Sequence, residues 1–135
     1  MTTASDAIVR AYLEAVQAAR RTLAADEPWR RVAALLATDV RWRFAGGAGC
    51  RLWPVELNGR DAVLEQLRQA PAFWSRLRTE TISVLRCGPV VLVEQVRTLV
   101  AESGVEEVKP VAHVFTVIDG LIADVRTYRN DAWKA

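Results

Sequence analysis

The sequence predicts an α+β domain in which a cone-shaped, strongly curved, mainly antiparallel sheet wraps around three helices. Three observations carry this prediction. Apolar residues recur at helical spacing in the first half of the chain, strand-like alternation begins near residue 75, and Asp119-Gly120 joins two apolar runs. An Asp-Gly pair between such runs is a strong hairpin signal. A bent sheet packed on helices would enclose a cavity of ligand size.

The first helix is predicted from Thr3 to about Leu23. Thr3 and Asp6 have the spacing of a capping box, and an apolar stripe that includes Tyr12 and Val16 follows them. The sequence therefore predicts that one face of this helix packs against the sheet.

Two further helices are predicted from their boundary residues. Asp26 and the proline that follows would begin the second helix, and Thr38-Asp39 would end it. Asn58 has capping-box spacing to an aspartate and would begin the third helix, which must end before Pro71.

The strands are predicted from alternation between turns. A short strand covers 40–44, and the glycine-rich stretch 45–57 has no period and is predicted to be a loop. The next strand covers 77–86, with the odd-numbered residues 77–85 on one face. A long strand over 90–101 leads into the hairpin at 105–129, whose first strand is apolar on both faces apart from His113.

Composition narrows the class of protein. The 135 residues are expected to form a single domain, residues 1–135, and the net charge of +2, from 18 basic and 16 acidic residues, is too balanced for a nucleic-acid-binding surface. The chain has no 18-residue apolar stretch and its N-terminus does not read as a signal peptide, so we expect a cytoplasmic protein without a membrane span. With two cysteines and one histidine, we expect neither a metal site nor a cofactor.

The order of elements, with the strings ATDVRWRF, NGRDAV and VAHVFTVIDGLIADVRTY, resembles the nuclear transport factor 2-like superfamily. Within it the chain looks most like the SnoaL-like cyclases and the limonene-1,2-epoxide hydrolases. The resemblance covers nearly the whole chain and implies the cone-shaped fold. The superfamily contains enzymes and proteins without catalysis, so function must be argued from the site.

The resemblance to the epoxide hydrolases also implies where a site would lie. Their water-holding tyrosine and asparagine fall on Trp42 and Phe44, and their bridging arginine falls on Gln95. Their two catalytic aspartates fall on Arg97 and Thr127. Neither of these residues can serve as that family's general acid or base.

The ketosteroid isomerases of the same superfamily are similar at Tyr12, where they carry a hydrogen-bonding tyrosine. Their basic aspartate would fall near Phe44, and their second aspartate near Val111 or Ala112. The carboxylates of this second enzyme class are therefore absent as well.

Four polar residues are the candidate catalytic residues: Gln95, Arg97, His113 and Thr127. Strand parity directs all four to the face that the helices cover, so we expect them to converge on one cavity. His113 would act as acid or base, and Arg97 with Gln95 would stabilise negative charge. Each has a structural alternative: a hydrogen-bonded core histidine, or an arginine in a salt bridge at the cavity mouth.

Aromatic and aliphatic residues are the candidate ligand-binding residues, and simple core packing is the alternative for Tyr12, Trp42 and Trp74. They are Tyr12, Trp42, Phe44, Trp74, Val111 and Phe115.

Three functions are consistent with the sequence. The first is a small-molecule enzyme of secondary metabolism, of the cyclase, isomerase or epoxide-opening type, acting on an apolar substrate. The second is a binding domain without chemistry, and the third is a dimerisation domain. We expect a small-molecule ligand, no nucleic acid and no membrane partner, and a homodimer through the outer sheet face, where Ile82, Val84, Val96 and Val114 are expected to be exposed.

Overall fold

The computed structural model describes residues 4–22, 25–46, 55–69 and 76–129. Over these ranges it contains three helices and six strands, which confirms the predicted α+β class. The helices are α1 (Ser5–Arg21), α2 (Glu27–Leu35) and α3 (Arg60–Arg68). The strands are β1 (Leu36–Gly46), β2 (Val55–Asn58), β3 (Leu77–Cys87), β4 (Val90–Val100), β5 (Glu106–Ile118) and β6 (Leu121–Arg129).

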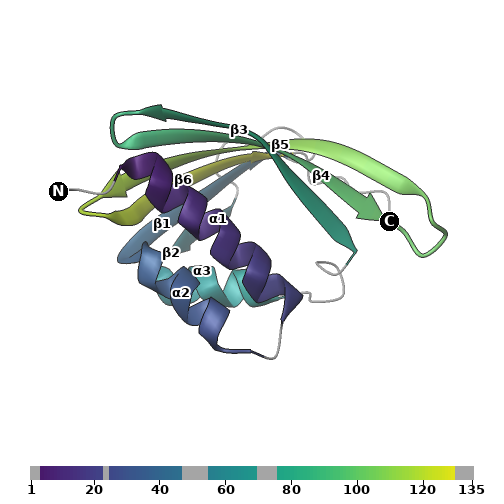
Figure 1. Cartoon of the computed structure of the whole chain (residues 1–135), viewed down its shortest axis with the longest axis horizontal. Helices are drawn as coiled ribbons and strands as arrows, with labels where there is room; N and C mark the ends of the chain where they lie inside the picture. The colour runs from purple at the N-terminus through teal and green to yellow at the C-terminus, as the bar shows by residue number, and fades with distance from the viewer. Residues whose placement is uncertain (1–3, 23–24, 47–54, 70–75, 130–135) are drawn as a thin grey trace.

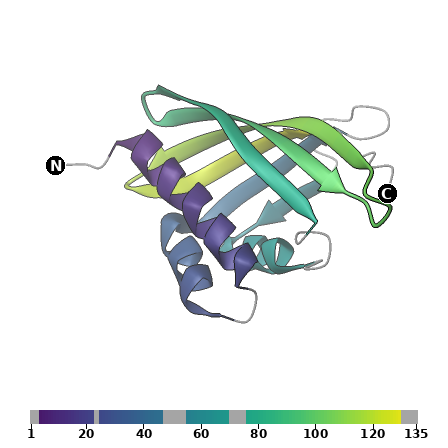
Figure 2. The same ribbon diagram turned by 45° about the vertical axis from the view of Figure 1, so that its right-hand side comes forward.

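The six strands of the described segments form one sheet in the order β2-β1-β6-β5-β4-β3. Neighbouring strands are antiparallel except β1 and β6, which run parallel, so the prediction of a mainly antiparallel sheet is confirmed. Figures 1 and 2 show the helices gathered on one face of the sheet, with α1 crossing the strands. The predicted strong curvature of the sheet stays a prediction. None of the helices in the described ranges is long and apolar enough to cross a membrane.

The predicted Asp-Gly hairpin is present between β5 and β6. Ile118 pairs with Leu121, so the loop contains Asp119 and Gly120 alone. Both residues have positive φ, 54° and 77°, as a two-residue turn that matches the strand twist requires. Glycine adopts this conformation without steric cost, and aspartate tolerates it better than most residues. This turn sets the register of the first two pairs, and a shift between Thr116 and Val117 then places His113 opposite Thr127.

The prediction that the odd-numbered residues 77–85 all lie on one face of β3 is wrong for the second half of the strand. The register shifts between Thr81 and Ser83, so Ile82 is an extra residue in a bulge. After the bulge the parity inverts: Val84 packs against the core, whereas Leu85 is 56% exposed. A bulge arises from pairing with β4, and the regular alternation of the β3 sequence carries no local sign of it.

The boundaries around β1 also differ from the prediction. The second helix ends at Leu35 and not at Thr38-Asp39, because Leu36 is already extended and pairs with Ile122 on β6. The stretch 45–57 is not all loop, since β1 runs on to Gly46 and β2 pairs with β1. Both differences come from long-range pairing that local sequence does not encode.

The predicted helix caps are only partly present. Asp26 is at the N-cap of α2 without a side-chain capping hydrogen bond. Gly59, with a φ of 93°, and not Asn58, is at the N-cap of α3. The predicted cap at Thr3 lies outside the described residues, and Ala4 is at the N-cap of α1.

Candidate functional site

A cavity of about 590 Å³ lies between the inner face of the sheet and helices α1 and α3. This volume is in the usual range for pockets that bind small organic molecules. One part of its lining is aromatic, formed by Tyr12, Trp42, Phe44 and Phe115. The rings of Trp42 and Phe44 are stacked at 6.0 Å, and that of Tyr12 meets Phe115 edge-on at 5.7 Å. The lining therefore suits a flat, apolar molecule.

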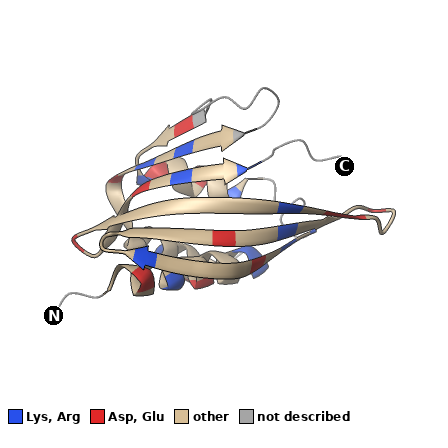
Figure 3. Ribbon diagram, turned by 90° about the horizontal axis from the view of Figure 1, so that it is seen from above, with Lys and Arg blue, Asp and Glu red and all other residues tan. Residues whose placement is uncertain are grey.

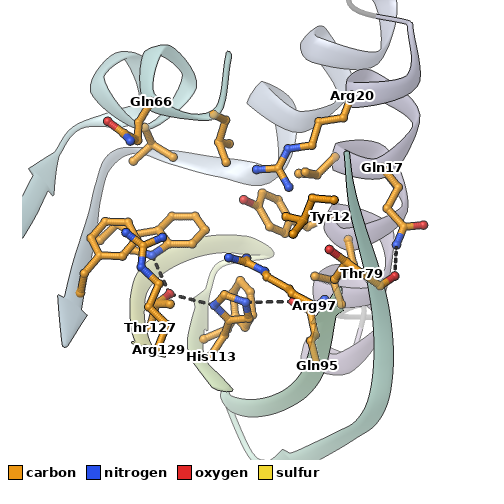
Figure 4. Close-up of a pocket in the computed structure, with 18 of the residues that line it drawn as sticks. Tyr12, Gln17, Arg20, Gln66, Thr79, Gln95, Arg97, His113, Thr127 and Arg129 are labelled. Carbon is orange, nitrogen blue, oxygen red and sulfur yellow. Dashed lines mark hydrogen bonds between the residues drawn. The ribbon is translucent and has the colours of Figure 1, made fainter. Parts of the chain in front are cut away.

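A chain of buried and partly buried hydrogen bonds joins polar groups at the inner face of the sheet, and we call it the histidine network. Its members are Trp42, Thr81, Gln95, His113 and Thr127. His113 is directly opposite Thr127 in the β5–β6 pairing. His113, Gln95 and Thr127 are each at most 5% exposed. Figure 4 shows the bonds of His113 to Thr127 and to Gln95 as dashed lines.

The donors and acceptors of the network fix the tautomer of His113. The Gln95 amide oxygen lies 3.0 Å from Nε2 of His113, and because this oxygen can only accept, Nε2 carries the proton. Nδ1 then holds the lone pair and accepts from the Thr127 hydroxyl at 2.8 Å. That hydroxyl in turn accepts from the Trp42 indole N–H at 2.8 Å. Gln95 also donates to Thr81 at 3.2 Å. Both ring nitrogens of His113 are therefore occupied by protein partners.

The surroundings keep His113 neutral. Burial lowers the pKa of His113 well below its usual range, and the charges of Arg97, Arg129 and Arg20 lower it further. Burial also raises the pKa of Tyr12, so its hydroxyl stays protonated. The cavity thus presents a neutral imidazole and a phenol donor at physiological pH.

The charged side chains among the described lining residues of the cavity are all arginines. Five arginines, and no aspartate or glutamate, are among the described residues that line it: Arg20, Arg21, Arg78, Arg97 and Arg129. Arg78 forms a salt bridge of 2.7 Å with Glu106 at the exposed rim. Arg129 stacks over the ring of Phe44, with 4.5 Å from its guanidinium carbon to the ring centroid. Such a lining favours negative charge in a ligand.

The structure brings most of the predicted site residues to this cavity. The candidate catalytic residues Gln95, Arg97, His113 and Thr127 all line it, as do Tyr12, Trp42, Phe44 and Phe115. Their roles in binding or catalysis stay predictions.

The two remaining predicted ligand-binding residues are Val111 and Trp74. Val111 is buried but is not part of the lining, because its strand neighbours Gln95 and Arg129 have the longer side chains that reach the cavity. The prediction for Trp74 lies outside the described residues.

Sequence analysis missed four arginines of the described lining, Arg20, Arg21, Arg78 and Arg129, and the spacing in the sequence points to two of them. Arg20 lies four and eight residues after Val16 and Tyr12, so the helical stripe already contained it. Arg129 follows Thr127 by two residues and shares its face. Spacing would have found both, but charged residues near the ends of elements are ordinarily solvent-exposed.

A metal site has no support in the described ranges. These residues contain no group of three or more histidine, cysteine, aspartate or glutamate side chains that could hold an ion.

Comparison with known proteins agrees with this geometry. The fold is shared with a nuclear transport factor 2-like protein from Burkholderia xenovorans, at 18% identity and a TM-score of 0.69 over 96% of this chain and 92% of that one. Residues 9–125 match the SnoaL-like domain family, and the chain belongs to that family. No curated protein matches the sequence.

Two similar structures carry the names of enzymes. One is a putative ketosteroid isomerase from Kribbella flavida, at 22% identity and a TM-score of 0.70 over 97% of this chain and 81% of that one. The other is an epoxide hydrolase from M. tuberculosis of the limonene epoxide hydrolase-like type, at 24% identity and a TM-score of 0.64 over 96% and 84%. At these identities the similarity establishes the fold.

Proposed function

We propose that the chain binds a small, largely apolar organic molecule in the cavity between α1, α3 and the sheet. The observation that carries this proposal is the cavity itself, about 590 Å³, with aromatic rings over an ordered base of polar groups. Small-molecule sites combine such apolar walls with a few placed polar groups. The isomerase and the epoxide hydrolase of the same fold are consistent with small-molecule recognition.

Binding without acid–base chemistry is favoured by the state of His113. Its Nδ1 lone pair accepts from Thr127, and its Nε2 proton is donated to Gln95. To take a proton from a ligand, His113 would have to lose the Thr127 bond. The imidazolium would then lie among the charges of Arg97, Arg129 and Arg20, which already lower the pKa of His113. Both requirements oppose a general-base role.

A second candidate function is catalysis of the cyclase, isomerase or epoxide-opening type. It is favoured by Arg97 in the same cavity, which could stabilise negative charge developing on a substrate. Turnover of limonene oxide, or of a polyketide-like substrate, by the unchanged protein would support this candidate over simple binding.

Binding of a neutral fluorescent probe tests the proposal. N-phenyl-1-naphthylamine is expected to bind one molecule per chain with increased emission, because it is apolar and fits the cavity volume. Val16 lines the cavity, so Val16→Trp should place a ring inside it and weaken probe binding about tenfold or more. Ala11→Trp is the matched control, since Ala11 is on the exposed face of α1. Absence of binding, or equal binding by both variants, would refute the proposal.

We also propose that the chain forms a homodimer through the outer face of the sheet. Val96 and Val114 are partly exposed there, and Figure 3 shows long uncharged stretches between the charged positions of the strands. Val84, also predicted for this face, instead packs against the core. Light scattering at micromolar concentration is expected to give twice the chain mass of 15.0 kDa. A mass of one chain would contradict the proposed dimer.

A further inference from the structure

We propose that the ligand is an organic acid, with an apolar ring system and one carboxylate that the guanidinium groups of Arg20, Arg97 and Arg129 bind. This inference rests on the proposed binding function and adds the chemical class of the ligand. Its basis is the charge of the cavity lining, the positions of the three arginines and the aromatic rings beside them.

The lining carries a large excess of positive charge. Five arginines line the cavity, and the described lining residues include no carboxylate. Arg78 pairs with Glu106 at the rim, and Arg21 is exposed, which leaves Arg20, Arg97 and Arg129 as the inner cations.

The three inner arginines come from three elements and meet over one volume. Arg20 is on α1, Arg97 on β4 and Arg129 on β6. Figure 4 shows their side chains pointing into the cavity above His113. A site that strands and a helix build together is held more rigidly than a site on loops, which favours a specific anion site over a diffuse basic surface.

The chemistry of these groups fits a carboxylate. A guanidinium group offers a rigid fork of N–H donors that matches two carboxylate oxygens. The guanidinium carbon of Arg129 lies over the ring of Phe44, a cation–π contact that places this charge beside the aromatic wall. Burial lowers the pKa of Arg20 to about 10, so Arg20 remains cationic at neutral pH. The protonated Tyr12 hydroxyl, which also lines the cavity, adds a neutral donor.

The rest of the ligand is constrained by the aromatic residues beside the arginines. Trp42, Phe44 and Phe115 line the same cavity, and the stacked Trp42–Phe44 pair presents a flat apolar wall. An inorganic anion would leave this wall uncovered, whereas a neutral hydrocarbon would form no charge-assisted hydrogen bond with the arginines. An aromatic or alicyclic acid satisfies both parts of the lining.

A competition experiment on the unchanged protein separates this inference from the proposed function. N-phenyl-1-naphthylamine is bound first, and 2-naphthoate or 2-naphthamide then competes with it. The two competitors have nearly the same shape and differ in charge. We expect 2-naphthoate to displace the probe at about tenfold lower concentration than the amide, because charge-assisted hydrogen bonds to guanidinium exceed neutral ones. Arg97→Met should remove most of this difference, whereas Arg10→Met, on the exposed face of α1, should preserve it.

Each result has a distinct meaning. If the probe binds but both competitors displace it equally, the cavity takes neutral ligands and the organic-acid proposal is wrong while the binding function stands. If the probe and both competitors fail to bind, the proposed function itself is refuted. If Arg10→Met abolishes the preference for 2-naphthoate as strongly as Arg97→Met, the effect is one of net charge, and the site at the three arginines is overturned.

Discussion

Replacing His113 by alanine is expected to lower the free energy of unfolding by about 2–4 kcal/mol. The substitution removes a buried ring that packs on Phe115, with 5.8 Å between ring centroids, and both of its hydrogen bonds. It also leaves Gln95 and Thr127 with one partner fewer in a buried position. Urea unfolding of wild type and variant, followed by tryptophan fluorescence, measures the difference.

A conservative substitution separates the hydrogen bonds from the packing. Thr127→Val keeps the shape of the side chain but removes the hydroxyl that joins Trp42 to His113, and should cost about 1–3 kcal/mol. Thr116→Val is the control, because Thr116 is a partly exposed threonine on the neighbouring strand. Equal stability of Thr127→Val and the control would show that the histidine network contributes nothing to folding.

The stability of the protein is expected to fall as the pH drops below about 6.5, with a slope approaching about 1.4 kcal/mol per pH unit from His113. Burial and the nearby arginines hold the pKa of His113 in the folded state below its unfolded value. The unfolded chain therefore binds a proton that the folded chain does not. The contribution is complete above the unfolded pKa and is lost as the pH falls toward the folded pKa. Urea unfolding at pH 7.5, 6.5 and 5.5 measures the slope.

The control for this pH dependence is unusually direct because the chain has a single histidine. No other side chain has an ordinary pKa between 5.5 and 7.5. His113→Gln retains hydrogen-bonding groups but does not titrate, so its stability should stay nearly constant over this range. Parallel pH profiles of wild type and His113→Gln would mean that His113 titrates alike in the folded and unfolded chain.

Much of the candidate site could be predicted because residues two apart on a regular stretch of strand share a face. Gln95 and Arg97 are two apart on β4, and the buried residues of β5 and β6 identify the inner face for His113 and Thr127. The Asp-Gly turn sets the register only as far as Val117 and Ile122, and a one-residue shift after that pair brings His113 opposite Thr127. The convergence of these four residues required no knowledge of the tertiary structure beyond the sheet itself.

The features that sequence could not supply depend on contacts between distant segments. The bulge at Ile82 exists only against β4, and β2 is a strand only because it pairs with β1. The direction of each bond in the histidine network also requires the positions of Trp42 and Thr127, which are 85 residues apart. Arg20 and Arg129 had the correct spacing, but a charge at the end of an element gives no local sign of facing inward.

The parallel pairing of β1 with β6 constrains the order in which this domain can assemble. Strands β3 to β6 form a meander of sequential antiparallel neighbours, whose hairpins can form locally and fast. By contrast, β1 must wait for the last strand of the sheet, since its interior edge pairs with β6 alone. During synthesis, α1, α2 and β1 therefore emerge with their apolar faces uncovered. Trp42 and Phe44 lie on β1, so they join the cavity only when β1 pairs with β6. We therefore expect ligand binding to begin only after this pairing has formed.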